Sequence, residues 1–177
     1  MSDPPALSML ERAPFEAAGV LRVQAESDRF AAAALARAAA KRLGLSSRAC
    51  EAVQIAACEL AGNLVRHAGG GSVELGVSAE ASVVRLCASD RGPPIHDVEM
   101  AFADGSTDRG PILPEEVFRR RGIGAGLGAL RRLALVLVIA QSRQGKVITA
   151  YLGQEVRPEG VGCPVVVRAG RDDSAEG

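Results

Sequence analysis

Hydrophobic and polar residues follow two spacings along this chain, one typical of strands and the other typical of helices. Apolar and polar residues alternate over 19–25, which predicts a strand. The alanine-rich segment 28–43 predicts a helix, with Ser27 as a suitable N-cap and Gly44 as its end. A second helix is predicted over 47–67, because its apolar residues recur at helical spacing and form one buried stripe: Val53, Ala57, Leu60 and Leu64.

The middle of the chain predicts strands joined by short turns. The segments 72–78 and 82–89 are adjacent and favour a hairpin. Further along, the pattern predicts a short helix near 97–103, a helix that follows 122–128, and two buried strands at 135–140 and 146–152. Because neighbouring strands are joined by turns rather than helices, this order favours a two-layer α/β (α+β) sandwich over a doubly wound sheet.

Three segments lack this periodicity. Residues 1–18 are rich in Pro and Ala, and we expect a loose leader. Residues 154–177 are expected to be a largely disordered extension, with one strand near 165–168. Residues 104–123 have the length of a functional lid or a disordered insertion. The sequence therefore predicts one folded domain over 19–153.

The composition narrows the function classes. Hydrophobic residues make up 47% and charged residues 24%, enough for a sizeable core. The 21 Lys and Arg balance the 21 Asp and Glu, and aromatics are only 3%, so we expect no direct contact with nucleic acid. The four cysteines form no CxxC pair, which disfavours a disulfide framework. The absence of a signal-peptide pattern and of a long apolar run predicts a cytoplasmic protein without membrane contact.

Three polar residues share one face of the second predicted helix. Glu59, Asn63 and His67 are four residues apart, so they project from one ridge beside the buried stripe. An amide oxygen can bind Mg²⁺ and a nearby carboxylate can accept a proton, although a solvated polar face explains the same pattern. Gly62 lies inside this helix at a cost of about 1 kcal/mol relative to Ala, which indicates a close approach of a ligand or another backbone.

Two loops carry further candidates. Asp90 follows an apolar strand and precedes a turn with Gly92, where it could bind an exocyclic amine or form an ordinary Asx turn. A ladder of alternate glycines then leads into a predicted helix: Gly122, Gly124, Gly126 and Gly128. Such a ladder lets backbone N–H groups approach phosphate oxygens at a helix N-terminus, although a hinge or a close helix contact would also require glycine. No Lys-Ser or Lys-Thr follows, so the ladder is not a Walker A loop.

The order of these segments is more specific than any one of them. ELAGNLVRH, DRGPPI and GIGAGLG resemble the N box, the first G box and the second G box of the GHKL ATPase superfamily. GIGAGLGALRRL and the preceding ADGST are similar to the anti-sigma-factor-like serine/threonine kinases, particularly the RsbT-type switch kinases. The resemblance spans about residues 19–153. It implies a Bergerat ATP-binding fold, in which helices cover one face of a mixed sheet and a lid at about 104–123 covers ATP.

The resemblance also implies a role for each motif residue. Glu59 would be the catalytic base, Asn63 the Mg²⁺ ligand, and His67 would close the N box beside the nucleotide. Asp90 would contact the adenine amino group, and Gly92 would let the backbone pass the base. The phosphates would be surrounded by residues of the second glycine segment: Gly122, Gly124, Ala125, Gly126 and Leu127.

For function, the resemblance implies an ATP- and Mg²⁺-dependent kinase that phosphorylates Ser or Thr on a STAS-domain antagonist protein in a partner-switching pathway. A downstream phosphatase or a sigma factor would be the alternative partner, and a homodimer is compatible with this scheme. Two other classes stay open. One is a non-catalytic module that sequesters a partner with weak or no ATP binding, and the other is the catalytic domain of a histidine kinase, for which little chain precedes residue 19.

The sequence departs from the family pattern at two places. Pro94 stands where the family has the second Gly of DxGxG, and because Pro fixes φ at about −65°, the turn must take another shape that would alter ATP affinity or selectivity. Residues 108–121 look like an insertion or a lengthened lid that ends in Arg119, Arg120 and Arg121. These arginines could reach phosphates or a phosphorylated partner, or form a solvated basic patch.

Overall fold

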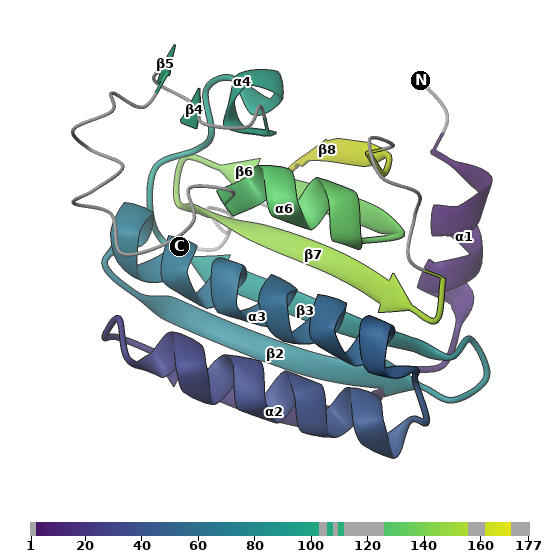
Figure 1. The fold of residues 1–177 in the computed structure, drawn as a ribbon. Helices are drawn as coiled ribbons and strands as arrows, with labels where there is room; N and C mark the ends of the chain where they lie inside the picture. Colours follow the sequence, from purple (N-terminus) through teal and green to yellow (C-terminus); the bar gives the residue numbers. More distant parts are fainter. Residues whose placement is uncertain (1–2, 103–105, 108–109, 112–125, 156–161, 171–177) are drawn as a thin grey trace, which may run out of the picture.

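The computed structural model describes residues 3–102, 106–107, 110–111, 126–155 and 162–170. A six-stranded sheet forms one layer and helices form the other (Figure 1). In this part of the chain the helices are α1 (Pro5–Arg12), α2 (Asp28–Arg42), α3 (Ser47–Ala68), α4 (Val98–Phe102) and α6 (Gly126–Leu133). The strands of the large sheet are β1 (Glu16–Val23), β2 (Gly71–Ser78), β3 (Val83–Asp90), β6 (Val136–Ser142), β7 (Gly145–Gly153) and β8 (Val165–Ala169), and β4 (Ser106–Thr107) pairs with β5 (Gly110–Pro111).

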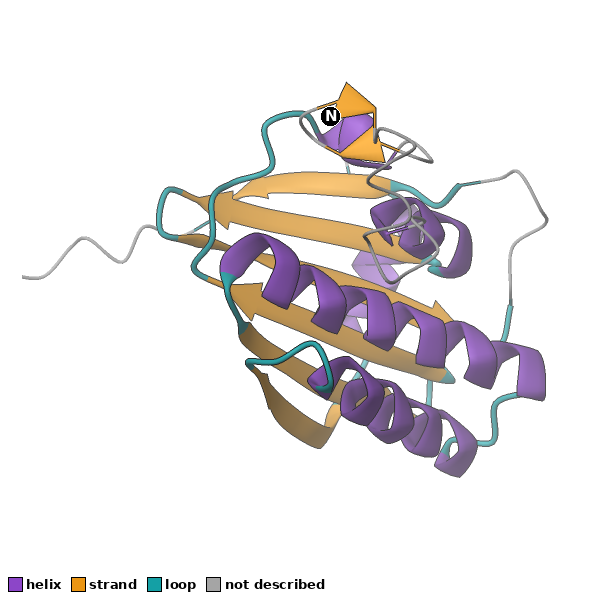
Figure 2. Cartoon of the chain, turned by 60° about the vertical axis from the view of Figure 1, so that its left-hand side comes forward, coloured by secondary structure: helices purple, strands orange, loops and turns teal. Residues whose placement is uncertain are grey.

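The large sheet is mixed, with the strand order β1-β2-β3-β7-β6-β8. All its neighbours are antiparallel except β6 and β8, which run parallel. The hairpins β2–β3 and β6–β7 confirm the turn-connected strands that the sequence predicted. The two-layer α+β sandwich with a mixed sheet is therefore confirmed, and Figure 2 shows the helices gathered mainly on one face.

The alternation of side chains along β3 decides which residues face the helices. Val84, Leu86 and Ala88 belong to the main core with α2 and α3, whereas Val83 belongs to a second cluster on the opposite face. Asp90 continues the first series, so its side chain lies on the helix side of the sheet. Its direct partner in β7 is Lys146, which precedes the buried Ile148 and Ala150 by the same alternation.

The helices α2 and α3 pack against each other and against this face. The buried residues of α2 are all alanines, and half of those of α3 are, which favours the helix and lets the backbones approach closely: Ala32, Ala33, Ala36, Ala39 and Ala40 in α2, and Ala49, Ala52, Ala56, Ala57 and Ala61 in α3. Larger side chains on α3, Leu60 and Leu64, reach the centre of the core. As a result α3 lies over the middle of the sheet, as Figure 1 shows.

Helix α3 has a well-defined cap at each end. The side chain of Ser46 accepts a hydrogen bond from the N–H of Ala49 at 3.3 Å. At the other end Gly69 adopts a left-handed φ of 71°, and the N–H of Gly70 donates to the carbonyl of Leu64 at 2.9 Å. This glycine termination places the end of α3 directly before β2, beside the end of β3.

The described part of the expected leader, residues 3–18, is not loose. They contain α1 and the start of β1, which begins at Glu16 rather than at the predicted Gly19. Pro5 occupies the first turn of α1, where its missing N–H is not needed, and Leu7 and Leu10 are buried on the face of the sheet that α2 and α3 leave uncovered. The helix was missed because only two apolar residues anchor it, and tertiary packing rather than periodicity stabilises it.

Two further details correct the sequence analysis. Ser27 precedes α2, but its side chain makes no capping hydrogen bond. Instead the carboxylate of Asp28 accepts hydrogen bonds from the N–H groups of Gln24 and Ala25, at 2.8 and 2.9 Å. In the C-terminal extension, the predicted strand near 165–168 is present as β8 and completes the large sheet as an edge strand. Of the other residues expected to be disordered, 156–161 and 171–177 lie outside the described part of the chain.

Candidate functional site

The described candidate residues gather around one end of the sandwich. The C-terminal part of α3 carries Glu59, Asn63 and His67, and its last residue, Ala68, contacts the turn after Asp90. Helix α6 lies beside α3 and begins at the same end of the sheet (Figure 1). The fold therefore brings three segments to one end of the sheet: the ELAGNLVRH part of α3, the turn that follows Asp90, and the start of α6.

On the α3 ridge, one arginine joins the predicted catalytic side chains. Arg66 Nη2 donates a hydrogen bond to Asn63 Oδ1 at 3.2 Å and lies 3.7 Å from Glu59 Oε2. Its other terminal nitrogen lies 3.5 Å from Glu26 Oε1, in the loop before α2. The side chains of Glu59 and Arg66 are 21% and 29% exposed, so this cluster is in contact with water.

The same arginine explains the glycine inside α3. A Cβ added at Gly62 would lie 2.9 Å from Arg66 Nη2 and 3.0 Å from Nη1. The close approach that the sequence indicated is therefore made by the chain's own guanidinium, rather than by a ligand or another backbone. Because the guanidinium is the far end of a flexible side chain, Gly62 permits this contact but does not fix it.

The polar residues on this side of α3 differ in their exposure to solvent. His67 is exposed, whereas Glu59 and Asn63 are half-buried, which agrees with a ridge that runs beside the buried stripe. Cys58 is half-buried, and burial raises the pKa of its thiol.

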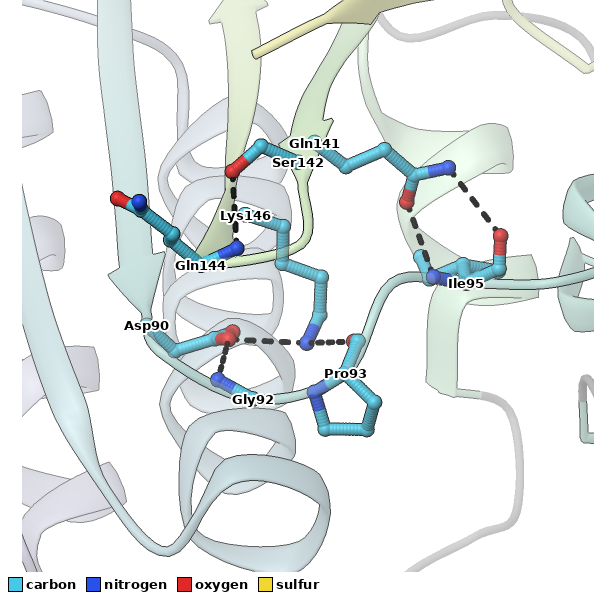
Figure 3. Close-up of polar contacts among 8 residues, drawn as sticks. All are labelled: Asp90, Gly92, Pro93, Ile95, Gln141, Ser142, Gln144 and Lys146. Carbon is cyan, nitrogen blue, oxygen red and sulfur yellow. Dashed lines mark hydrogen bonds and ion pairs between the residues drawn. The ribbon is translucent and has the colours of Figure 1, made fainter. Parts of the chain in front are cut away.

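At the end of β3, Asp90 forms an ion pair that the sequence did not indicate. Asp90 Oδ1 accepts a hydrogen bond from Lys146 Nζ at 3.0 Å, and both side chains are deeply buried, at 4% and 7% exposure. The same oxygen accepts from the N–H of Gly92 at 2.7 Å, which is the Asx turn considered from the sequence. Lys146 Nζ also donates to the carbonyl of Pro93 at 3.0 Å (Figure 3).

The loop after Asp90 is held by side chains of β6 and β7. Gln141 makes two hydrogen bonds to the backbone of Ile95: its Oε1 accepts from the N–H at 2.9 Å and its Nε2 donates to the carbonyl at 3.2 Å (Figure 3). Lys146 binds the same loop at Pro93. These two contacts hold the loop on either side of Pro94.

Close backbone contacts complete the turn. A Cβ at Gly92 would lie 2.7 Å from the Cβ of Ala68, so only glycine lets the turn approach the end of α3. A Cβ at Gly145 would lie 2.1 Å from the carbonyl oxygen of Asp90, and Gly145 has a φ of 150°. Both glycines therefore bring the Asp90 turn into contact with neighbouring segments. A hollow of about 630 Å³ opens beside this turn, lined among others by Asp90, Arg91 and Lys146.

The glycine ladder is only partly within the described residues. Gly122, Gly124 and Ala125 lie outside them, as do Arg119, Arg120 and Arg121. Gly126 begins α6 with a φ of 29°, and Leu127 packs against the main core. The described end of the ladder thus begins a helix, and the first N–H groups of any helix lack a partner within that helix, which is why helix N-termini are suited to binding phosphate.

The oxygen atoms that α3 presents at this end of the sheet suit a magnesium ion bound to a nucleotide. Glu59 and Asn63 present a carboxylate and an amide oxygen on one ridge, which are ligand types that Mg²⁺ prefers. In this structure a cation already lies among these oxygens, because Arg66 contacts both residues. The site therefore fits a cation chemically, and a bound cation would share or replace the contacts of Arg66.

Comparison with known proteins decides the family. A family model of the histidine kinase-like ATPase domain matches residues 23–152. The chain belongs to the histidine kinase-like ATPase family. It is 31% identical over 115 residues to the serine/threonine-protein kinase RsbT of Bacillus subtilis (strain 168), and the alignment covers 64% of this chain and 78% of RsbT.

These findings confirm the resemblance to GHKL ATPases and to RsbT-like kinases. Membership of an ATPase family implies that the chain uses ATP. Within the described ranges, no helix is both long enough and apolar enough to cross a membrane.

In this histidine kinase-like ATPase domain, sequence reasoning missed three residues near the site. Arg66 lies inside the quoted ELAGNLVRH motif, but the sequence analysis assigned it no role. Lys146 was read as the first residue of a buried strand, although a lysine there requires a buried partner. Gln141 gave no signal, because its contact with Ile95 depends on how β6 and the loop meet in space.

Proposed function

We propose that this protein is an ATP- and Mg²⁺-dependent serine/threonine kinase of a partner-switching pathway. Its substrate would be a Ser or Thr on a STAS-domain antagonist protein, and a phosphatase or a sigma factor would be its other partner. The similarity to RsbT supports the kinase class. The chemistry would take place in the cytoplasm, where ATP is available, and a homodimer is compatible with it.

The observation that carries this proposal is the pair Glu59 and Asn63, which are half-buried on one ridge of α3, the helix that ends at the Asp90 turn. Asn63 Oδ1 would be the protein ligand of Mg²⁺, which when bound supplies charge neutralisation at the phosphates. The side chain of Glu59 is partly exposed, and its carboxylate would accept the proton of an incoming hydroxyl. His67 lies one turn further along the same ridge, where it would border the nucleotide.

The remaining motif residues would bind ATP. Asp90 would accept a hydrogen bond from the adenine amino group, and Gly92 would let the backbone pass the base. The segment that leads into α6 would surround the phosphates, through Gly122, Gly124, Ala125, Gly126 and Leu127. Catalysis would then consist mainly of positioning and of charge stabilisation around a loose phosphoryl-transfer transition state.

The test is transfer of radiolabel from ATP to candidate STAS-domain proteins. We expect Glu59→Gln to slow labelling roughly 100-fold or more, because the proton acceptor is lost while the size of the side chain is kept. Glu51→Gln is the matched control, since Glu51 lies on the same helix and is exposed, and this variant should label at the wild-type rate. A Glu59→Gln protein with undiminished labelling would exclude Glu59 as the base, and an acid-labile phosphohistidine on the partner would identify histidine kinase chemistry instead.

A second candidate function is a non-catalytic module that sequesters its partner. The contacts of Arg66 with Glu59 and Asn63 favour this second function. The guanidinium already occupies the oxygens that catalysis would need for Mg²⁺ and for the proton. Titration calorimetry separates the two functions. Binding of the partner protein without any heat of ATP binding would select the sequestering module.

A further inference from the structure

The buried pair of Asp90 and Lys146 has hydrogen-bonding capacity that the fold does not use. Asp90 Oδ1 accepts from Lys146 Nζ and from the N–H of Gly92, whereas Oδ2 has no partner among the described residues. Asp90 and Lys146 both line the hollow beside this turn. One carboxylate oxygen therefore remains available as an acceptor beside a deeply buried ion pair.

Lys146 is in the same situation as a donor. Its ammonium group has three N–H donors, of which one points to Asp90 Oδ1 and a second to the carbonyl of Pro93, each at 3.0 Å. Within the described part of the chain, no acceptor takes the third N–H. A free donor and a free acceptor thus stand side by side, at the end of β3 and the start of β7.

The surroundings fix both groups in place. The Asx turn holds the carboxylate, the Pro93 carbonyl holds the ammonium, and the two residues face each other directly in the β3–β7 ladder. Burial makes these hydrogen bonds stronger than they would be in water, so neither side chain rotates away at little cost. The pair is also neutral overall, which suits a neutral ligand edge better than an isolated carboxylate would.

From this arrangement we infer that Lys146, together with Asp90, reads the adenine edge of the nucleotide. The third N–H of Lys146 donates to N1 of adenine, and Asp90 Oδ2 accepts from the 6-amino group. This inference rests on the proposed function, in which the chain binds ATP, and it adds Lys146 as a residue that determines base specificity.

The same pair disfavours guanine. Guanine presents an oxygen acceptor at position 6 and an N–H donor at position 1, which is the reverse of the adenine pattern. The carbonyl oxygen would then face Asp90 Oδ2, and the N1–H would face the ammonium of Lys146. A site whose buried polar groups are left unpaired by the wrong ligand discriminates strongly against that ligand.

The test compares ATP with 1-deaza-ATP, which keeps the 6-amino group but has a C–H in place of N1. The measurement is the dissociation constant from titration calorimetry, which needs no phosphate acceptor protein. The wild-type protein should bind 1-deaza-ATP roughly tenfold or more weakly than ATP, because a hydrogen bond from a charged donor is lost and the donor stays buried.

Two variants separate Lys146 from other causes. In Lys146→Met, and in Asp90→Asn/Lys146→Met, ATP and 1-deaza-ATP should bind within about twofold of each other, because the donor to N1 is absent. The double variant leaves no unpaired buried charge. It therefore allows ATP and 1-deaza-ATP binding to be compared even if Lys146→Met does not fold. Lys41→Met is the matched control, since Lys41 is an exposed residue of α2, and it should discriminate like the wild type.

Each result decides the inference. Equal binding of the two nucleotides by the wild type, or full discrimination in the double variant, would overturn the role of Lys146 and leave the proposed kinase intact. Absence of ATP binding by the wild type would overturn the proposed function and this inference together. Discrimination in the wild type that disappears in the Lys146 variants would establish it.

Discussion

Two carboxylates and two cations stand at the same end of this molecule, in different surroundings. On the α3 ridge, Glu59 and Arg66 lie 3.7 Å apart with 21% and 29% of their side chains exposed. At the end of β3, Asp90 and Lys146 lie 3.0 Å apart with 4% and 7% exposed. Both are oppositely charged pairs, but only the second is shielded from water.

This difference separates a pair that can rearrange from a pair that cannot. A partly exposed ion pair contributes little to stability, and Arg66 is already shared among Glu59, Asn63 and Glu26. A buried pair with further hydrogen bonds resists rearrangement, because separating its charges leaves each one without water. The ridge is therefore suited to steps in which charges move, and the Asp90 turn is suited to recognition of a fixed shape.

The largest expected effect is on the buried pair. Lys146→Met should lower the free energy of unfolding by about 3–5 kcal/mol, because it leaves the Asp90 carboxylate buried without a cation. The matched substitution on the exposed pair, Arg66→Met, should cost less than about 1 kcal/mol. Urea denaturation of both variants measures the difference.

A double variant checks the cause of that effect. Asp90→Asn/Lys146→Met should recover most of the stability lost in Lys146→Met, since no buried charge remains and the amide oxygen can still accept from the N–H of Gly92. Equal losses for Lys146→Met and Arg66→Met would show that burial does not distinguish the two pairs.

Two glycines sharpen the comparison, with effects of opposite sign. Gly145→Ala should destabilise the fold by more than about 1 kcal/mol, because its φ of 150° strains any side chain and its Cβ would lie 2.1 Å from a backbone oxygen. Gly62→Ala should leave stability unchanged or raise it by up to about 1 kcal/mol, since Ala favours the helix and only the Arg66 guanidinium must move. Thermal unfolding of the two variants tests both signs, and a comparable loss at Gly62 would mean that Arg66 is held rigidly.

The smallest expected effect concerns the loop that carries Glu26. Hydrogen bonds from the backbone N–H groups of Gln24 and Ala25 lower the pKa of Asp28. A lowered folded-state pKa contributes stability above the unfolded value of about 3.9, and this contribution is lost as pH falls through the folded-state pKa. Asp28→Asn should therefore flatten the decline of stability below about pH 4, as measured by denaturation at a series of pH values. An unchanged acid decline would show that these hydrogen bonds do not contribute.

Much of the architecture could be predicted from local pattern. Helix α3 begins at the predicted residue and ends one residue beyond the prediction, because an apolar stripe, the Ser46 cap and Gly69 all act within a few residues of each other. Helix α1 could not be predicted, because its two buried leucines pack on a face of the sheet that the local pattern does not reveal.

The candidate site also contains some features that local spacing predicts and one that it does not. The ridge of Glu59, Asn63 and His67 follows from a spacing of four, and the Asx turn of Asp90 follows from the Gly two residues later. The partner of Asp90 is a different case. Lys146 is 56 residues away in the chain, and it reaches Asp90 only because β7 pairs with β3 in one particular register.

The sequence by itself determined the helical ridge, the glycine segments and the family, because these depend on spacing between residues that are close in the chain. The tertiary structure decided which charges are buried, and therefore which pair is fixed and which can rearrange. Arg66 and Lys146 are both cations in apolar-rich segments, and only the strand pairing and the packing of α3 show that one meets water and the other does not. Burial is a property of the whole fold, since it requires segments far apart in the sequence to exclude water from the same place.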